Sequence, residues 1–504
     1  MTRLARTIII LGVLLLTACN PQAPANPPTA THVARSTDAS TLLGVAWDDR
    51  SAFVTGLTGS ERDVLSQLDG ATVYQMDLRI ADDLLELDGR QAVRYTNRTA
   101  EALAEIYFRL YPNLFGGLAE VQSVTVNDRE VEPGYELLNS ALRVPLSPPL
   151  ESSRQTVIEM TFSVDVPAGG EGNYGMFGLQ EGVLALAHFY PMIPVHDDEG
   201  WNVEIPSPQG DVVFADSSFY LVRVNAPTAL TMVASGVESE RRAVGGRQEV
   251  TYAAGPVRDF YLAASMDYVV VSGQLGETTI SSYAPPELRA GAEAALRYTV
   301  EALRILGERL GAYPFTEFDV VATPTQAYGI EYPGITAMAL RLYPPRDEYP
   351  PAYLESTIAH EVSHQWFYST VGNDQLDEPW LDEALAQYIT LLYWQDLYGV
   401  PGGEGFRDSL LERWARVDNA DIPIGMPVQS YEGREYGAIV YGRGPLFIEA
   451  LAQRMGQSVF DAFLRDYYVT HKWGIATADS FQELAEQHCR CDLGALFDEW
   501  VYEP

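Results

Sequence analysis

Apolar and polar residues alternate along the first half of this chain and change to helical spacing in the second half. Between about Ala71 and Gly273, short alternating runs such as TVYQMDLRI, TVIEMTFSV and TMVAS are separated by Gly, Pro and Asn-Asp. A period of two with frequent turn signals is typical of β-strands. We therefore predict a β-rich domain over residues 71–272.

The second half has a different pattern. Pro286–Leu310 has a long helical spacing, followed by the strand-like run EFDVVATP, by YGIEYPGITAMAL and by further helical patterns as far as Trp500. These features predict an α/β domain over residues 273–504, and hence an α+β chain with more than one domain. The sequence of this second half contains neither a repeat nor a glycine-rich phosphate loop of the P-loop or Rossmann kind.

The first 18 residues are predicted to be a targeting segment. Arg3 and Arg6 precede the apolar run Thr7–Leu16, which is too short to span a bilayer as a helix of about 20 residues. The segment ends in Leu-Thr-Ala-Cys, which resembles the lipobox of bacterial lipoproteins, in which the cysteine is acylated. We expect an exported protein, anchored by lipid on Cys19 to the cell membrane and facing the extracytoplasmic side. A plain export signal cut near Ala18 is the alternative.

Residues 19–40 are rich in Pro, Ala and Thr and lack an apolar period, which predicts a disordered tether. Residues 41–70 have helix-like spacing and are predicted to form a helical lead-in. The formal net charge of −36 over 504 residues argues against nucleic acid as a partner and against an electrostatic membrane patch.

The stretch HEVSH contains two histidines at the spacing of one helical turn. His360 and His364 would lie on one face of a helix, where two imidazoles can bind one Zn²⁺ at about 2.0–2.1 Å per nitrogen. Glu361 would point about 100° away from His360, where a carboxylate can act on a metal-bound water as general base. This is the HExxH motif of zinc hydrolases.

A catalytic zinc needs a third protein ligand and one open position. The next predicted helix, with Asp377 as its cap and Pro379 in its first turn, carries acidic residues at Glu378, Asp382 and Glu383. The 18 residues between His364 and Glu383 allow the chain to turn back and bring Glu383 to the metal. With this set complete, we interpret His188 and His196 as packing or loop residues.

Three motifs together resemble the M1 family of metallopeptidases, the gluzincin aminopeptidases. HEVSH followed by WLDEALAQY resembles the zinc core of that family, and Tyr328-Gly-Ile-Glu-Tyr332 lies where its members carry Gly-Ala-Met-Glu-Asn. Tyr441-Gly-Arg-Gly444 resembles a Tyr-x-Lys-Gly motif. The resemblance covers roughly Ala71 to Pro504 and implies a saddle-shaped β-sheet domain followed by a thermolysin-like zinc catalytic domain with a helical lobe.

The resemblance implies a role for each matching residue. His360, His364 and Glu383 would bind one zinc ion, Glu361 would activate water, and Tyr441 would donate a hydrogen bond to the oxyanion.

Two further residues would contact a peptide substrate. Glu331 would bind the free α-amine, and Gly329 would allow the substrate backbone to approach an edge strand. Tyr436 is the rival of Tyr441, and Glu331 could instead be a solvated edge-strand carboxylate.

The sequence departs from the family at Ile330 and Tyr332, which replace Met and Asn. It also ends soon after the helical lobe, so we expect a more open site that admits longer peptides. The favoured function is release of N-terminal residues from peptides. The alternatives are an endopeptidase on the same zinc core, a non-catalytic zinc-binding lipoprotein, and an ester or epoxide hydrolase. Cys489 and Cys491 are expected to be structural or incidental, as a local disulfide or as thiols. A second metal site with the adjacent His488 is the alternative, although three ligands from four consecutive residues do not easily surround one ion.

Overall fold

The computed structural model describes residues 44–502, apart from residues 171 and 347. The predicted signal segment (residues 1–18), the predicted lipidation residue Cys19 and the predicted tether (residues 19–40) lie outside the described residues.

The described part of the lead-in consists of two 3-10 helices, η2 (Ser51–Gly56) and η3 (Arg62–Ser66), rather than an α-helix. Gly56 and Gly59 interrupt the apolar spacing, and glycine in a helix interior costs about 1 kcal/mol relative to alanine. The backbone N–H of Thr58 donates instead to the carbonyl of Pro314 at 3.0 Å. The lead-in is therefore held by a contact with the second half of the chain.

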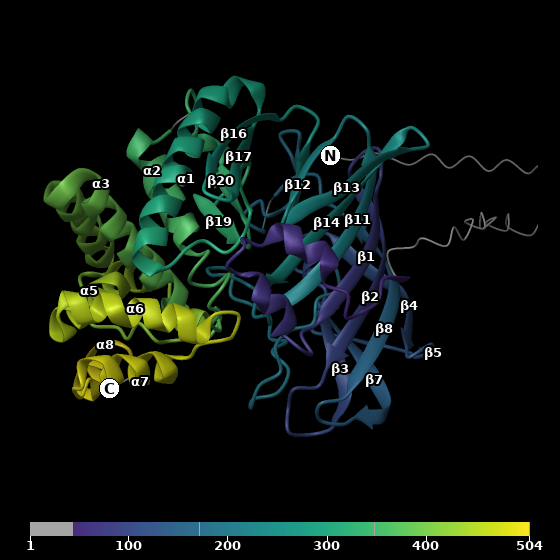
Figure 1. Ribbon diagram of the computed structural model, residues 1–504, viewed down its shortest axis with the longest axis horizontal. Coiled ribbons are helices and arrows are strands. Elements are labelled where there is room, and N and C mark those ends of the chain that lie inside the picture. Colours follow the sequence, from purple (N-terminus) through teal and green to yellow (C-terminus); the bar gives the residue numbers. More distant parts are fainter. Residues whose placement is uncertain (1–43, 171, 347, 503–504) are drawn as a thin grey trace, which may run out of the picture. The chain divides into compact units, whose positions relative to one another are not determined.

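The β-rich region is built on an eight-stranded sheet (Figure 1). Its strands, in spatial order, are β13 (Val237–Val244), β14 (Arg247–Val257), β11 (Ser218–Pro227), β1 (Val73–Ile80), β2 (Glu86–Thr96), β8 (Gln155–Asp165), β4 (Leu118–Val126) and β5 (Arg129–Glu130). All neighbours are antiparallel except β1 and β11, which run parallel. The strand-turn alternation of the sequence thus corresponds to an extended, mainly antiparallel sheet.

Two smaller sheets belong to the same region. One has the order β12 (Thr231–Ala234), β15 (Leu262–Ser265), β10 (Val183–Leu186) and β9 (Phe177–Gln180), and the other has the order β3 (Leu103–Arg109), β7 (Ala141–Leu150) and β6 (Gly134–Glu136). Tyr190, just after β10, packs edge-on against Tyr74 and Tyr220 of the large sheet, with ring centroids 5.9 and 5.8 Å away. Buried aromatic side chains therefore fill the space beside the large sheet.

A five-stranded mixed sheet begins the second half of the chain. Its order is β16 (Val269–Leu275), β17 (Thr278–Ala284), β18 (Glu317–Thr323), β20 (Ile335–Ala339) and β19 (Gly329–Tyr332), which places β19 at an edge. The predicted boundary between residues 272 and 273 falls inside β16. Because β16 continues the alternating pattern of the preceding strands, the pattern alone does not reveal that a new sheet has begun.

Helices form the rest of this half (Figure 1). They are α1 (Arg289–Leu310), α2 (Pro351–Ser363), α3 (Trp380–Trp414), α4 (Glu435–Ala438), α5 (Gly444–Met455), α6 (Gln457–His471), α7 (Ala478–Cys489) and α8 (Gly494–Trp500). Its short helical turns are η5 (Pro286–Leu288), η6 (Leu340–Leu342), η7 (Ala415–Val417), η8 (Val428–Ser430) and the π-helical turn η9 (Ile439–Arg443). One further short turn, η4 (Tyr111–Asn113), lies in the β-rich half. Gly399, at φ 72°, divides α3 into two segments just before Pro401. Within residues 44–502 no helix has the length and apolarity needed to cross a membrane.

A buried arginine connects the β-rich region to the helical region. The Arg258 guanidinium donates to the carbonyls of Tyr368 at 2.7 Å and of Ala215 at 3.0 Å. The adjacent Asp259 carboxylate accepts a 3.1 Å hydrogen bond from the Tyr368 hydroxyl and lies 3.5 Å from Nδ1 of His188. His188 is therefore a buried packing residue beside this connection, as predicted, and is not part of the metal-ligand cluster.

Candidate metal centre and active-site cavity

Helix α2 and the residue that follows it position both histidines of HEVSH. Pro351 occupies the first turn of α2, and His364 is the C-terminal cap, so His360 and His364 face each other across the last turn. Nδ1 of His364 lies 3.1 Å from the carbonyl oxygen of Phe367. Because a carbonyl only accepts, Nδ1 carries the proton, and Nε2 is left with a lone pair directed at the other ligands.

Glu383 comes from the first turn of α3. The helix begins at Trp380, with Pro379 immediately before it, and its backbone has no side-chain cap. The predicted cap, Asp377, is wrong: the carboxylate of Asp374 accepts instead from the N–H groups of Leu376 and Asp377 in the preceding turn. Asp374 precedes two residues whose N–H groups point back at it, a local geometry that favours aspartate in turns.

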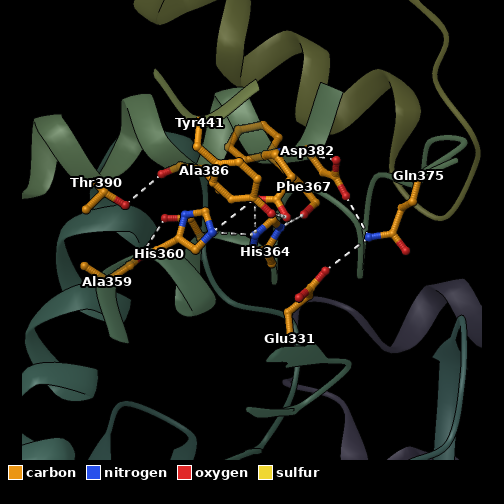
Figure 2. Close-up of polar contacts among 12 residues, drawn as sticks. Glu331, Ala359, His360, His364, Phe367, Gln375, Asp382, Ala386, Thr390 and Tyr441 are labelled. Carbon is orange, nitrogen blue, oxygen red and sulfur yellow. Dashed lines mark hydrogen bonds and ion pairs between the residues drawn. The ribbon is translucent and has the colours of Figure 1, made fainter. Parts of the chain in front are cut away.

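The three predicted ligands meet at one point. Figure 2 shows the two histidines, His360 and His364, side by side there. Nε2 of His360 lies 3.2 Å from Nε2 of His364 and 3.1 Å from Oε2 of Glu383, and the remaining distance, from His364 to Glu383, is 3.5 Å. The edge of a tetrahedron with bonds of about 2.0–2.1 Å is about 3.3–3.4 Å, so these separations fit three ligands of one zinc ion. Oε2 of Glu383 is also buried without a hydrogen-bond partner among the described residues.

The general-base candidate Glu361 is packed against a strand. Its side chain is 3% exposed, and Gly329 of β19 lies against it. A Cβ built on Gly329 would lie only 2.4 Å from Oε1 of Glu361. The sequence suggested that Gly329 makes room for substrate; in the structure the missing side chain makes room for Glu361.

Further carboxylates surround the metal ligands. Oε1 of Glu331 accepts from Nε2 of Gln375 at 3.1 Å, and the same amide donates to Asp382 at 2.8 Å (Figure 2). Asp211, from a loop of the β-rich region, has a carboxylate oxygen within 4.8 Å of Glu331 and Glu383. The site therefore contains more acidic groups than the zinc ligand set requires.

Burial and mutual repulsion determine how these acids titrate. Burial raises the pKa of Glu331 and of Asp211 well above the usual values, and the charges of neighbouring carboxylates raise both further. Burial also works against ionisation of Glu383, yet the charges of His364 and His360 lower the pKa of Glu383 below its usual range. Binding of a cation, either a metal ion or an ammonium group, is therefore favoured at this site, because a positive charge would offset the repulsion among these carboxylates.

The structure distinguishes Tyr441 from its rival Tyr436. The Tyr441 hydroxyl donates to Oε1 of Glu383, and its ring lies 6.0 Å from that of His360. The Tyr436 hydroxyl is buried and without a hydrogen-bond partner among the described residues, behind the Tyr441 ring at 5.6 Å. Tyr441 is thus the tyrosine that reaches the metal ligands.

The Arg-Gly of the Tyr-x-Arg-Gly motif holds the turn in place rather than facing the metal. Arg443 donates to Asp421 and to the carbonyl of Trp500 at 2.8 Å. A Cβ on Gly444 would lie 2.7 Å from Cβ of Ala384 in α3. Close contact between α3 and the start of α5, directly after the π-helical turn, therefore requires glycine, and this contact helps to position the turn that carries Tyr441.

One cavity of about 760 Å³ is lined by several of these groups, including His360, Glu383 and Tyr441. Its lining includes the acidic residues Asp211, Glu331, Glu361 and Glu383, and also two arginines, Arg413 and Arg416.

Sequence reasoning missed Asp211 and Gln375. Neither follows a periodic pattern: Asp211 lies in the irregular run SPQGD, and Gln375 in the turn before α3. An aspartate in a polar loop and a glutamine in a turn are ordinary surface residues by sequence, and only the tertiary fold brings them to the metal ligands.

The remaining candidates lie elsewhere. His196 packs edge-on against Trp201 at 4.9 Å, in agreement with a loop role. Cys489 and Cys491 are joined by a disulfide. Among the described residues, neither they nor His488 belong to a potential metal cluster.

Comparison with known proteins finds a family match in the second half of the chain. Residues 294–500 match the family described as Peptidase family M1 domain. Aminopeptidase 2 of Candida albicans is 25% identical over 302 residues, which cover 57% of this chain and 33% of that protein. Human Aminopeptidase B is 25% identical over 307 residues, 56% of this chain and 46% of that protein. The chain thus spans between a third and a half of the length of these relatives.

Solved structures align with a larger share of this chain. The M1 zinc metallopeptidase from Deinococcus radiodurans has a TM-score of 0.65 at 21% identity, covering 86% of this chain and 95% of that one. A mutant of that enzyme, bound to a Tyr-Ser-Ala substrate, has a TM-score of 0.66 at 21% identity, with 86% and 95% covered. The match confirms the predicted fold class, β-sheets followed by a mixed-sheet and helical region. Residues 294–500 therefore match a peptidase family M1 domain, and the chain has the fold seen in M1 zinc metallopeptidases.

Proposed function

We propose that this chain is a zinc-dependent aminopeptidase that releases N-terminal residues from peptides. The observation that carries the proposal is the placement of two acids that are not needed as zinc ligands, Glu331 and Asp211, within 4.8 Å of Glu383. A free α-ammonium group fits between such carboxylates, whereas an internal peptide group offers them no charge. The names of the matched relatives support the same activity.

Each residue of the site has a role that its position allows. Bound zinc would supply a Lewis acid and lower the pKa of water. Glu361 would accept the proton of the attacking water and transfer it to the leaving amine. The Tyr441 hydroxyl would donate to the carbonyl oxygen as negative charge develops on it.

The edge strand β19 would align the peptide. It pairs with β20 on one side only. Its other edge is free among the described strands to hydrogen-bond an extended peptide backbone, as in β-augmentation. Glu331 on this strand would then hold the N-terminus next to the metal, so that the first peptide bond is the one attacked.

A pair of matched peptides tests this proposal. One tetrapeptide is prepared with a free N-terminus and with an acetylated one, and products are identified by mass spectrometry. We expect release of the first residue from the free form and no cleavage of the acetylated form. Internal cleavage of both forms would instead establish the endopeptidase alternative.

We further propose that the chain is an exported lipoprotein attached through Cys19. The motif Leu-Thr-Ala-Cys at the end of an apolar run supports this, and so does the Cys489–Cys491 disulfide, because disulfides persist in oxidising compartments. Incorporation of labelled fatty acid should occur in the full chain and be lost in Cys19→Ala. Equal labelling of both would contradict the proposal.

A further inference from the structure

The second segment of α3 forms one wall of the active-site cavity. The residues that line the cavity recur every three or four positions, which is the period of one helical face. They are Pro401, Gly402, Gly405, Phe406, Ser409, Glu412 and Arg413. A Cβ on Gly405 would meet nothing within 4 Å, so the glycine faces open space. Arg413 is the last residue of α3 in this stripe, and Arg416 in the following turn η7 also lines the cavity.

Arg413 has no acidic or hydrogen-bonding partner within residues 44–502, although the chain has 69 Asp and Glu residues against 33 Lys and Arg. On the same helical segment, Arg407 is paired with Glu449 at 2.8 Å. Partial burial and the adjacent Arg416 lower the pKa of Arg413, and the nearby charges of Tyr441 and Glu383 act in the opposite direction. The Arg413 guanidinium therefore keeps hydrogen-bond donors available to an anion in the cavity.

The cavity therefore has groups of both signs. Acids that would hold an ammonium group lie next to the metal ligands. Arg413 of α3 and Arg416 of η7, which form no ion pair with any described residue, line the same 760 Å³ space. Glu412 lines that wall too, but it forms no ion pair with Arg413 in the described chain. A short peptide has a charge of each sign, an ammonium group at one end and a carboxylate at the other. Guanidinium binds carboxylate through two parallel hydrogen bonds.

We propose that Arg413, with Arg416 beside it, binds the C-terminal carboxylate of the substrate, so that peptides of a few residues are preferred over long chains. This inference rests on the proposed function. Arg413 also lies in the last turn of α3, where a cation stabilises the helix dipole. If Arg413 only stabilised the helix dipole, its replacement would change kcat/KM equally for substrates with a C-terminal carboxylate and with a C-terminal amide. A comparison of the two substrates therefore separates the two roles.

The test uses one tripeptide with a free N-terminus, prepared as the C-terminal acid and as the C-terminal amide. For the zinc-loaded full chain we expect kcat/KM to be about ten- to a hundredfold higher for the acid, the range of a charge-assisted hydrogen bond. Arg413→Gln should lower kcat/KM for the acid to the level of the amide and leave the amide unchanged. Arg407→Gln, on the same helix but away from the cavity wall, should leave both unchanged.

The two ways of failing can be told apart. Equal cleavage of acid and amide by the wild type overturns this inference and leaves the aminopeptidase proposal intact. An equal loss on both substrates in Arg413→Gln also overturns it, because the residue would then act through Tyr441 or through folding. Cleavage of neither form by the wild type overturns the proposed function and this inference with it.

Discussion

Replacing Gly329 by alanine tests the packing that positions the general base. Gly329 does not have a positive φ, so the backbone at this position accepts alanine. The new Cβ, however, would lie 2.4 Å from Oε1 of Glu361, whereas ordinary van der Waals contact begins at 3.4 Å. The carboxylate must therefore move by about 1 Å, and a misplacement of that size costs about a hundredfold in rate.

A hundredfold loss corresponds to about 2.7 kcal/mol of transition-state stabilisation. It lies at the lower end of the roughly 10²- to 10⁴-fold that general acid–base catalysis contributes. We expect kcat/KM to fall by about that factor in Gly329→Ala, because the Glu361 carboxylate is displaced. Zinc content should stay at the wild-type value, because the three atoms nearest the new methyl group all belong to Glu361, which is not a zinc ligand.

The assay measures kcat/KM on a short peptide together with zinc by elemental analysis and the melting temperature. Gly405→Ala is the matched control: it lines the same cavity, but its Cβ meets nothing within 4 Å, so activity should be unchanged. Wild-type activity in Gly329→Ala would refute the reasoning, because the base would then tolerate displacement or the glutamate would not be the base.

Three other changes have defined outcomes. Glu383→Gln should weaken zinc binding by more than the roughly 10- to 100-fold that an outer-shell change costs, and full zinc content after dialysis against a chelator would contradict this. Asp211→Asn should raise KM for peptides with a free N-terminus about tenfold while zinc content is unchanged; an unaltered KM would remove Asp211 from the ammonium site. Burial raises the pKa of Asp259 to about 7, so the folded state holds a proton that the unfolded state has released, and stability falls as pH rises from about 4 to about 7. Asp259→Asn should therefore gain about 1–3 kcal/mol relative to wild type between pH 5 and pH 8 in denaturant titrations, and a constant difference would contradict the assignment.

Local spacing predicted the metal ligands correctly. His360 and His364 are one helical turn apart whatever the surrounding fold, and the intervening chain is long enough for Glu383 to reach them. The long helix α1 was also predictable, because its apolar stripe persists over six turns. These features depend on geometry within one or two neighbouring elements.

Residues whose roles arise from tertiary contact could not be predicted in the same way. Asp211 approaches the site from the β-rich region, and Arg413 acquires its surroundings only because α3 breaks at Gly399. The role of Gly329 was interpreted as space for substrate, but the side chain that needs the space belongs to the chain itself. Sequence patterns record the period of an element and not the identity of its neighbours.

The central claim, that the histidines and Glu383 hold zinc while Glu361 performs proton transfer, is tested most directly in the Glu361→Gln variant. Zinc stoichiometry and peptide turnover are measured on the same sample. The account predicts one zinc per chain, as in the wild type, and turnover reduced by at least about a hundredfold. Turnover close to that of the wild type, with zinc bound, would contradict it.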